Sequence, residues 1–181
     1  MSLTLALAGD SFITRCRPLA DHPSALAVRE IIASADLGIT NLEALPNGFR
    51  GYPSPTSGDL CAAAEPGIID ELTKFGFGAL TWANNHTLDF GTAGVLEALD
   101  ALDSRGVAHA GVGIDLDAAS VPCYLDRPRG SVAVLACTSS FETGQQATAQ
   151  SAGLTARPGV NPLRHRRVNH LPAPLIDALR E

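Results

Sequence analysis

The stretch Thr81-Trp82-Ala83-Asn84-Asn85-His86-Thr87-Leu88-Asp89-Phe90-Gly91 is the segment around which the fold can be predicted. It follows a short apolar run, Phe77 to Leu80, and precedes a helical pattern from Gly91 to Ser104. This order predicts a strand, a polar loop and a helix. Two amides, an imidazole and a carboxylate lie close together in the loop, at the end of a strand where open α/β sheets bind their ligands.

An Asn-rich turn would explain the same loop without any function. Asn and Asp side chains bond their own backbone and tolerate left-handed conformations, so Asn84-Asn85 can simply turn the chain. Two other predicted strands also end in polar side chains, at Asp10 and Glu43. That joint placement favours a functional site over a plain turn.

The rest of the chain alternates apolar runs with helical patterns, which predicts an α/β fold with a mostly parallel sheet and flanking helices. We expect Leu3 to Ala8 to form a buried first strand. A helix should begin with Ser24 as N-cap and direct Leu26, Val28, Ile31 and Ile32 to the core. The further predicted elements are strands at Leu37–Thr40, Phe77–Trp82 and Val107–Val112, a helix from Glu65 to Gly76, and a hairpin of Pro122–Leu125 with Ser131–Cys137.

Two segments depart from this alternation. Residues 44–63 hold three Pro and three Gly without periodicity, which predicts a long loop, and such loops are usually functional or mobile. Residues 1–140 are expected to form the main domain, and residues 141–181 an irregular polar tail, which could begin a second half. Only Pro174 to Arg180 suggests a final short helix in that tail.

Composition narrows the class of protein. The 181 residues are 45% hydrophobic with a net charge of −6, typical of one globular domain and unlike a nucleic-acid binder. The four cysteines lack Cys-x-x-Cys spacing, so no zinc or redox motif is indicated. Met1 to Ala8 is too short for a signal peptide or a membrane span, which predicts a cytoplasmic protein, with a membrane-associated complex as the alternative.

The three polar strand ends predict a metal site. In a parallel sheet, the carboxyl ends of the strands lie along one edge, so Asp10, Glu43, Asn85 and His86 can converge there. Carboxylates, an amide oxygen and an imidazole form a mixed set of ligands suited to Mn²⁺, Fe²⁺ or Zn²⁺, with Mg²⁺ or Ca²⁺ as alternatives.

The same segments resemble a known family. Gly9-Asp10, Asn41-Leu42-Glu43 and the 83–91 stretch are similar to successive motifs of the CapA-like capsule or poly-γ-glutamate synthesis family, in the calcineurin-like metallophosphoesterase superfamily. Arg15, residues 106–113 and residues 157–164 also match the style of the family. The resemblance extends from about residue 3 to about residue 164, in order and with compatible spacing.

The resemblance implies a role for each matching residue. Asp10, Glu43 and Asn85 would bind a divalent metal, for which we expect Mn²⁺, with Fe²⁺, Zn²⁺ or Mg²⁺ as alternatives. His86 would serve as the catalytic acid or as a donor to the substrate oxyanion, and Asp89 would orient it. Metal-activated water would then attack phosphorus.

The expected substrate is an anionic small molecule or polymer. Arg15 and Asn84 are the candidates for binding its anionic group.

The sequence departs from the family pattern in two places. The superfamily begins with Asp-x-His, whereas Phe12 occupies the third position here. The family also continues into a second half with further histidine ligands, whose motifs are not found up to Glu181; His165 and His170 are expected on the surface. We therefore expect a fragment of a longer protein, with an open sheet that a homodimer or a partner chain could cover; an inactive remnant is the other interpretation.

The sequence thus predicts the N-terminal part of a CapA-like metal-dependent hydrolase. The rival hypothesis is a non-catalytic module that binds an anionic polymer or a partner subunit at the strand-end loops. A dinucleotide-binding domain is disfavoured, because the first strand leads into Gly-Asp-Ser-Phe rather than a glycine-rich turn.

Overall fold

A parallel four-stranded sheet forms the centre of the protein. The computed structural model describes residues 2–17, 22–57, 60–164, 168, 170–172, 175 and 178. The sheet strands lie side by side in chain order: β1 (Leu5–Ser11), β2 (Leu37–Leu42), β3 (Phe77–Thr81) and β4 (Ala108–Ala110). The predicted α/β class, a mostly parallel sheet with flanking helices, is confirmed.

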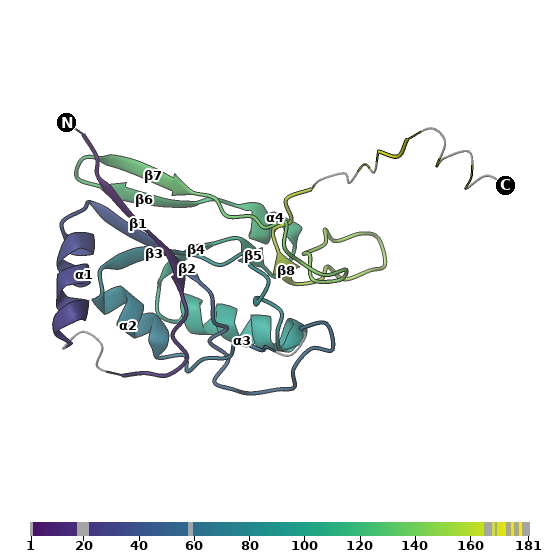
Figure 1. Ribbon diagram of the computed structural model, residues 1–181, viewed down its shortest axis with the longest axis horizontal. Coiled ribbons are helices and arrows are strands. Elements are labelled where there is room, and N and C mark those ends of the chain that lie inside the picture. The colour runs from purple at the N-terminus through teal and green to yellow at the C-terminus, as the bar shows by residue number, and fades with distance from the viewer. Residues whose placement is uncertain are drawn as a thin grey trace.

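The helices and a hairpin lie on opposite sides of this sheet (Figure 1). Helices α1 (Pro23–Ala33), α2 (Ile68–Lys74) and α3 (Gly91–Asp103) lie along one side, and the main core forms there. The hairpin of β6 (Cys123–Arg127) and β7 (Gly130–Val134) covers part of the other side, where its Leu125 and Val134 pack with Leu37 and Ala79 of the sheet. The predicted hairpin is therefore confirmed.

Two glycines with positive φ mark where elements end. Gly76, with φ of +102°, follows α2 and ends it, as predicted. Gly111, with φ of +105°, divides the predicted fourth strand into β4 and the short β5 (Val112–Gly113). A Cβ atom at position 111 would lie 2.7 Å from the Cβ of Ala83, so the turn there also needs the space that only glycine leaves.

The prediction of a buried first strand is wrong. β1 runs from Leu5 to Ser11 at the edge of the sheet, paired on one side with β2. Leu7 is 73% exposed, and Leu5 is also exposed. An apolar run predicts a buried strand only when both faces are covered, and the described residues leave β1 open.

The prediction for the first helix needs a similar correction. His22, rather than Ser24, is the N-cap, and its side chain accepts a hydrogen bond from the backbone N–H of Ser24. Of the expected core positions only Ile32 is buried, whereas Leu26, Val28 and Ile31 are exposed. One side chain of α1 therefore reaches the core, and the remaining apolar positions lie outside it.

The segment after residue 140 contributes to the packed structure. Gly159–Val160 forms β8, which pairs antiparallel with β5 beside α4 (Leu116–Ser120). Gln145, Ala147 and Val160 are buried, so these parts of the predicted irregular tail pack into the fold, whereas residues 149–155 are exposed. The helix predicted at Pro174 to Arg180 lies largely outside the described residues. No helix in the described part of the chain is long and apolar enough to cross a membrane.

Candidate functional site

The register of the sheet aligns the ends of three strands. Asp10 of β1 pairs with Asn41 of β2, and Asn41 pairs with Thr81 of β3. Glu43 follows β2 directly, and the 82–90 loop follows β3. The strand ends predicted to meet are therefore neighbours along one edge of the sheet.

The Asn41 side chain joins the two carboxylates at this edge. Its Nδ2 donates to Asp10 Oδ1 at 2.9 Å and to Glu43 Oε2 at 2.5 Å. Its Oδ1 accepts from Asn84 Nδ2 at 3.3 Å, which fixes the orientation of the amide. Asp10 and Glu43 thus converge on one nitrogen atom, although they are 33 positions apart in the sequence.

Two negative charges so close together are unfavourable without a cation. Burial raises the pKa of Glu43, and the neighbouring Asp10 carboxylate adds to that rise. His86 and the Asn41 amide act in the opposite direction. The net effect is a raised pKa for Glu43, and a cation bound between the two carboxylates would favour its ionised form.

His86 and Asp89 form a hydrogen-bonded pair beside these carboxylates. His86 Nδ1 lies 2.8 Å from Asp89 Oδ2, and His86 Nε2 lies 3.8 Å from Glu43 Oε1. Asp89 is 1% exposed, and its Oδ2 also accepts from the backbone N–H of Ala62 at 2.6 Å. An ionised Asp89 accepts both bonds only when Nδ1 of His86 carries the proton, so Nε2 is the nitrogen left for chemistry.

The long 44–63 loop holds this pair in place. Besides the Ala62 bond, the backbone N–H of Ser54 donates to the Asp89 carbonyl oxygen at 2.7 Å. The loop is well packed at both ends, where Leu45 and Ala62 are buried. The loop thus supplies one backbone donor to the Asp89 carboxylate and one to the Asp89 carbonyl oxygen, and the Asp89 side chain is shielded from solvent.

Phe12 contacts the same histidine from the end of β1. The rings of Phe12 and His86 have centroids 6.4 Å apart and meet edge to face at 63°. Phe12 therefore packs against His86 and supplies no metal ligand of its own.

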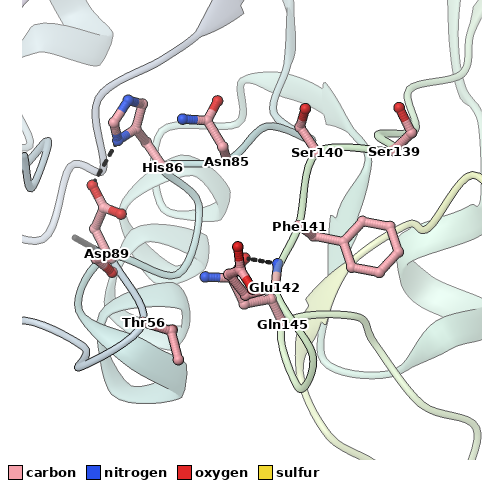
Figure 2. A pocket seen from close by; sticks show the side chains of 10 residues that line it. Thr56, Asn85, His86, Asp89, Ser139, Ser140, Phe141, Glu142 and Gln145 are labelled. Carbon is pink, nitrogen blue, oxygen red and sulfur yellow. Dashed lines mark hydrogen bonds and ion pairs between the residues drawn. The ribbon is translucent and has the colours of Figure 1, made fainter.

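A polar pocket opens on the side of His86 that faces the segment after β7 (Figure 2). Its volume is about 660 Å³, within the usual range of small-molecule sites. The lining comes from three segments distant in sequence: Thr56, Ser57; Asn85, His86, Asp89; Ser139, Ser140, Phe141, Glu142, Gln145. The predicted residues Asn85, His86 and Asp89 thus share one pocket wall.

The two predicted substrate-binding residues lie elsewhere. The Asn84 side chain is directed into the fold, where it donates to the Leu42 carbonyl oxygen at 2.9 Å and accepts from the backbone N–H of His86 at 3.0 Å. Arg15 pairs with Glu65 at 3.2 Å and lies over the Phe49 ring. Neither residue lines the pocket beside His86, so their predicted contact with substrate stays a prediction without geometric support.

The predicted metal ligands Asp10, Glu43 and Asn85 lie at or just after the ends of neighbouring strands. Within the described ranges, no group of three or more His, Cys, Asp or Glu side chains forms a metal-binding cluster. The donor set is instead two carboxylates, Asp10 and Glu43, that converge on one amide, with Asn85 on the adjoining loop. Paired carboxylates with an amide oxygen fit a hard or borderline divalent cation in their chemistry.

Sequence reasoning did not identify three residues that shape the site. Asn41 was noted within a motif but not assigned the position between the carboxylates. Glu142 and Gln145 line the pocket from a segment without helix or strand periodicity, so no pattern pointed to them. Only the three-dimensional path of residues 139–145 brings them opposite His86.

Comparison with known proteins places the chain in a family. Residues 4–176 match the family described as bacterial capsule synthesis protein PGA_cap. Two similar proteins of Sinorhizobium fredii (strain NBRC 101917 / NGR234), the uncharacterized proteins y4uA and y4sH, are each 34% identical to this chain over 181 residues. In both cases the match covers 98% of this chain and 39% of the relative, so the chain spans about two fifths of the length of these relatives. The chain belongs to the bacterial capsule synthesis protein family.

Proposed function

We propose that this member of the bacterial capsule synthesis protein family carries a metal-dependent hydrolase site of the phosphoesterase type, acting in the production of capsule or poly-γ-glutamate. The observation that supports the proposal most strongly is the hydrogen bond of 2.8 Å between His86 and the buried Asp89, next to the carboxylates that Asn41 brings together. An acid–base group and a cation-attracting pair at one sheet edge are what hydrolysis of a phosphoester requires.

In this proposal, the residues of the chain position and move a proton. Asp89 holds the proton of His86 on Nδ1 and stabilises the imidazolium form. His86 Nε2, when protonated, donates to the oxygen of the leaving group, and then returns to the neutral form. Asn84 accepts from the backbone N–H of His86 and keeps the loop in register with β2.

Asp10, Glu43 and Asn85 are the residues that would hold the divalent cation. When bound, the cation would supply Lewis-acid activation and neutralise negative charge on the phosphoryl oxygens. Mn²⁺ is the expected ion, with Fe²⁺, Zn²⁺ or Mg²⁺ as alternatives, because carboxylate and amide oxygens accept all of them.

Thermal unfolding with and without Mn²⁺ tests the metal site. At a free Mn²⁺ concentration about 100 times its dissociation constant, binding stabilises the folded state by about 2.7 kcal/mol. For a chain of this size the midpoint should rise by about 5–10 °C. Asp10→Ala and Asn85→Ala should lose most of this rise, whereas Glu30→Gln on the exposed side of α1 should keep it.

Hydrolysis of bis-p-nitrophenyl phosphate tests the reaction on the same preparations. Mn²⁺-dependent turnover that is lost with Asp10→Ala would support the hydrolase. A cooperative transition indifferent to Mn²⁺ in the wild-type chain would contradict the metal site and favour the non-catalytic binding module. Binding of an anionic polymer that survives a chelator would point to that module as well.

A further inference from the structure

The pocket beside His86 has a distinctive charge pattern. Its lining contains four hydroxyl side chains and one carboxyl group that belong to no catalytic pair: Thr56, Ser57, Ser139, Ser140 and Glu142. Among the described residues that line it, there is no lysine or arginine. The Asp89 carboxylate is already bonded to His86 and to Ala62. Apart from His86, a carboxylate or phosphate entering this pocket would therefore find no basic side chain among the described lining residues to receive it.

Gln145 presents a hydrogen-bond donor to the pocket. It is 5% exposed, and its Oε1 accepts from the backbone N–H of Glu142 at 2.9 Å. Because a backbone N–H can only donate, this bond fixes which end of the amide is oxygen. Figure 2 shows the amide nitrogen directed away from that bond, toward the side of the pocket where Asp89 lies. No described residue accepts a hydrogen bond from this nitrogen in the structure.

Because this nitrogen has no acceptor among the described residues and is not enclosed by protein, a ligand oxygen in the pocket could replace water as its hydrogen-bond acceptor. Hydroxyl groups both donate and accept, and thus suit the Thr56 and Ser140 hydroxyls as well as the free Glu142 carboxylate. A sugar ring offers several such groups on a compact frame that a volume of about 660 Å³ can hold.

We propose that this pocket binds the uncharged, hydroxyl-bearing carbohydrate part of the substrate, with Gln145 donating to one of its oxygens and Glu142 disfavouring anionic groups. The inference rests on the proposed function, because it concerns the substrate of the same site. The anionic phosphoryl group would lie at the strand ends near Asp10 and Glu43, and the neutral part would lie opposite His86.

A matched pair of monosaccharides tests this proposal on the full chain. Glucose and glucuronate differ in whether C6 is a hydroxymethyl or a carboxylate group. We expect glucose to produce saturable shifts in ¹H–¹⁵N spectra at the amides of Asn85, Ser140 and Gln145. Glucuronate should bind at least about tenfold more weakly, which corresponds to about 1.4 kcal/mol.

Two isosteric variants separate the roles of the two pocket residues. Gln145→Glu keeps the oxygen that accepts from Glu142 but replaces the donor nitrogen, and should weaken glucose binding about tenfold, as expected for one lost hydrogen bond. Glu142→Gln should bring glucuronate binding close to that of glucose. Glu30→Gln, on α1, is the control for a change of charge away from the pocket.

Several outcomes would overturn the proposal. These are tighter binding of glucuronate than of glucose by the wild-type chain, no saturable shifts with either sugar, or a Gln145→Glu variant that keeps its dispersed spectrum and binds glucose as well as the wild type. The titration is made with a chelator present. The sugar titration therefore does not depend on Mn²⁺ binding. The proposed sugar site and the proposed metal site can fail separately.

Discussion

The region around β3 and α3 and the region around β1 and α1 were predicted in the same terms but are packed very differently. Both consist of an apolar strand followed by a helix with apolar positions. Six residues of α3 are buried, whereas α1 buries only Ile32. Leu80 of β3 is 1% exposed, whereas Leu7 of β1 is 73% exposed. The contrast teaches that periodicity indicates which side chains can be buried, while topology decides which ones are.

The candidate site lies across the boundary between these regions. His86 and Asp89 come from the packed region, where the 44–63 loop encloses the Asp89 carboxylate. Asp10 comes from the open strand and is exposed at its end. The His86–Asp89 pair is therefore fixed by the core, whereas one of the two carboxylates that Asn41 brings together belongs to an edge strand.

The largest expected effect follows from changing the packed part of the site. For the proposed hydrolysis, Asp89→Asn should lower the rate by about 10²- to 10⁴-fold, because the amide no longer holds the His86 proton in place or stabilises the imidazolium. Initial rates on bis-p-nitrophenyl phosphate with Mn²⁺ would measure the loss.

Arg15→Ala is the matched control, because Arg15 pairs with Glu65 outside the pocket. It should change the rate far less than Asp89→Asn. A loss of similar size in both variants, with both still folded by circular dichroism, would show that Arg15 reaches the substrate and that the division of the site between the two regions is wrong.

The second prediction tests the contrast in packing directly. Leu102 of α3 is fully buried, and Leu102→Ala should lower the free energy of unfolding by about 2–5 kcal/mol because it leaves a cavity. Leu7→Ala in β1 should change it by no more than about 0.5 kcal/mol, since a surface position loses few contacts. Urea denaturation of the two variants beside the wild type would give both values.

Equal losses from the two leucine variants would be informative in a different way. They would mean that Leu7 is covered in solution, by a second copy or by another chain. Truncating an exposed side chain removes few buried contacts, so it cannot by itself lower the free energy of unfolding as much as truncating a core residue. Repeating the Leu7→Ala measurement across a range of protein concentrations would distinguish a second copy from a packed monomer.

Much of the fold could be predicted from the sequence, because the local signals and the final structure agree. Gly76 and the hairpin around Pro128 mark their elements correctly, and the 83–91 loop follows β3 as expected. The prediction that strand ends meet needed only the general rule for parallel sheets, and the alignment of Asp10 with Asn41 confirms it. The turn and loop signals depend on a few neighbouring residues each, whereas the meeting of the strand ends follows from the parallel arrangement of the sheet.

The parts that escaped prediction depend on contacts between distant segments. Burial of β1 and α1 could not be decided locally, because it depends on what covers the edge of the sheet. Glu142 and Gln145 reach the pocket only through the irregular path after β7. The Asn41 amide between two carboxylates required the register of β1 against β2, which the sequence pattern did not specify.

The smallest expected effect concerns the bonds that hold the open strand. Asp36, just before β2, accepts from the backbone N–H and the hydroxyl of Thr4, just before β1, each at 2.8 Å. These bonds, the backbone one first, lower the pKa of Asp36, and Arg129 adds to the effect. Because the pKa of Asp36 is lowered in the folded state, its ionised carboxylate stabilises the fold at pH values above the ordinary aspartate pKa of about 3.9. This stabilisation is lost as the pH falls through the pKa that Asp36 has in the folded protein.

Asp36→Asn should therefore lower the unfolding midpoint slightly at pH 7, and the difference from the wild type should disappear in acid. Asp100→Asn, on the exposed side of α3, is the control and should show no such dependence. Hydrogen exchange should become faster at the Thr4 amide and at the start of β1, while β3 amides stay protected, because only the open strand depends on this carboxylate. Faster exchange in both strands would mean that the two regions open together, and that the edge is less independent of the core than its exposure indicates.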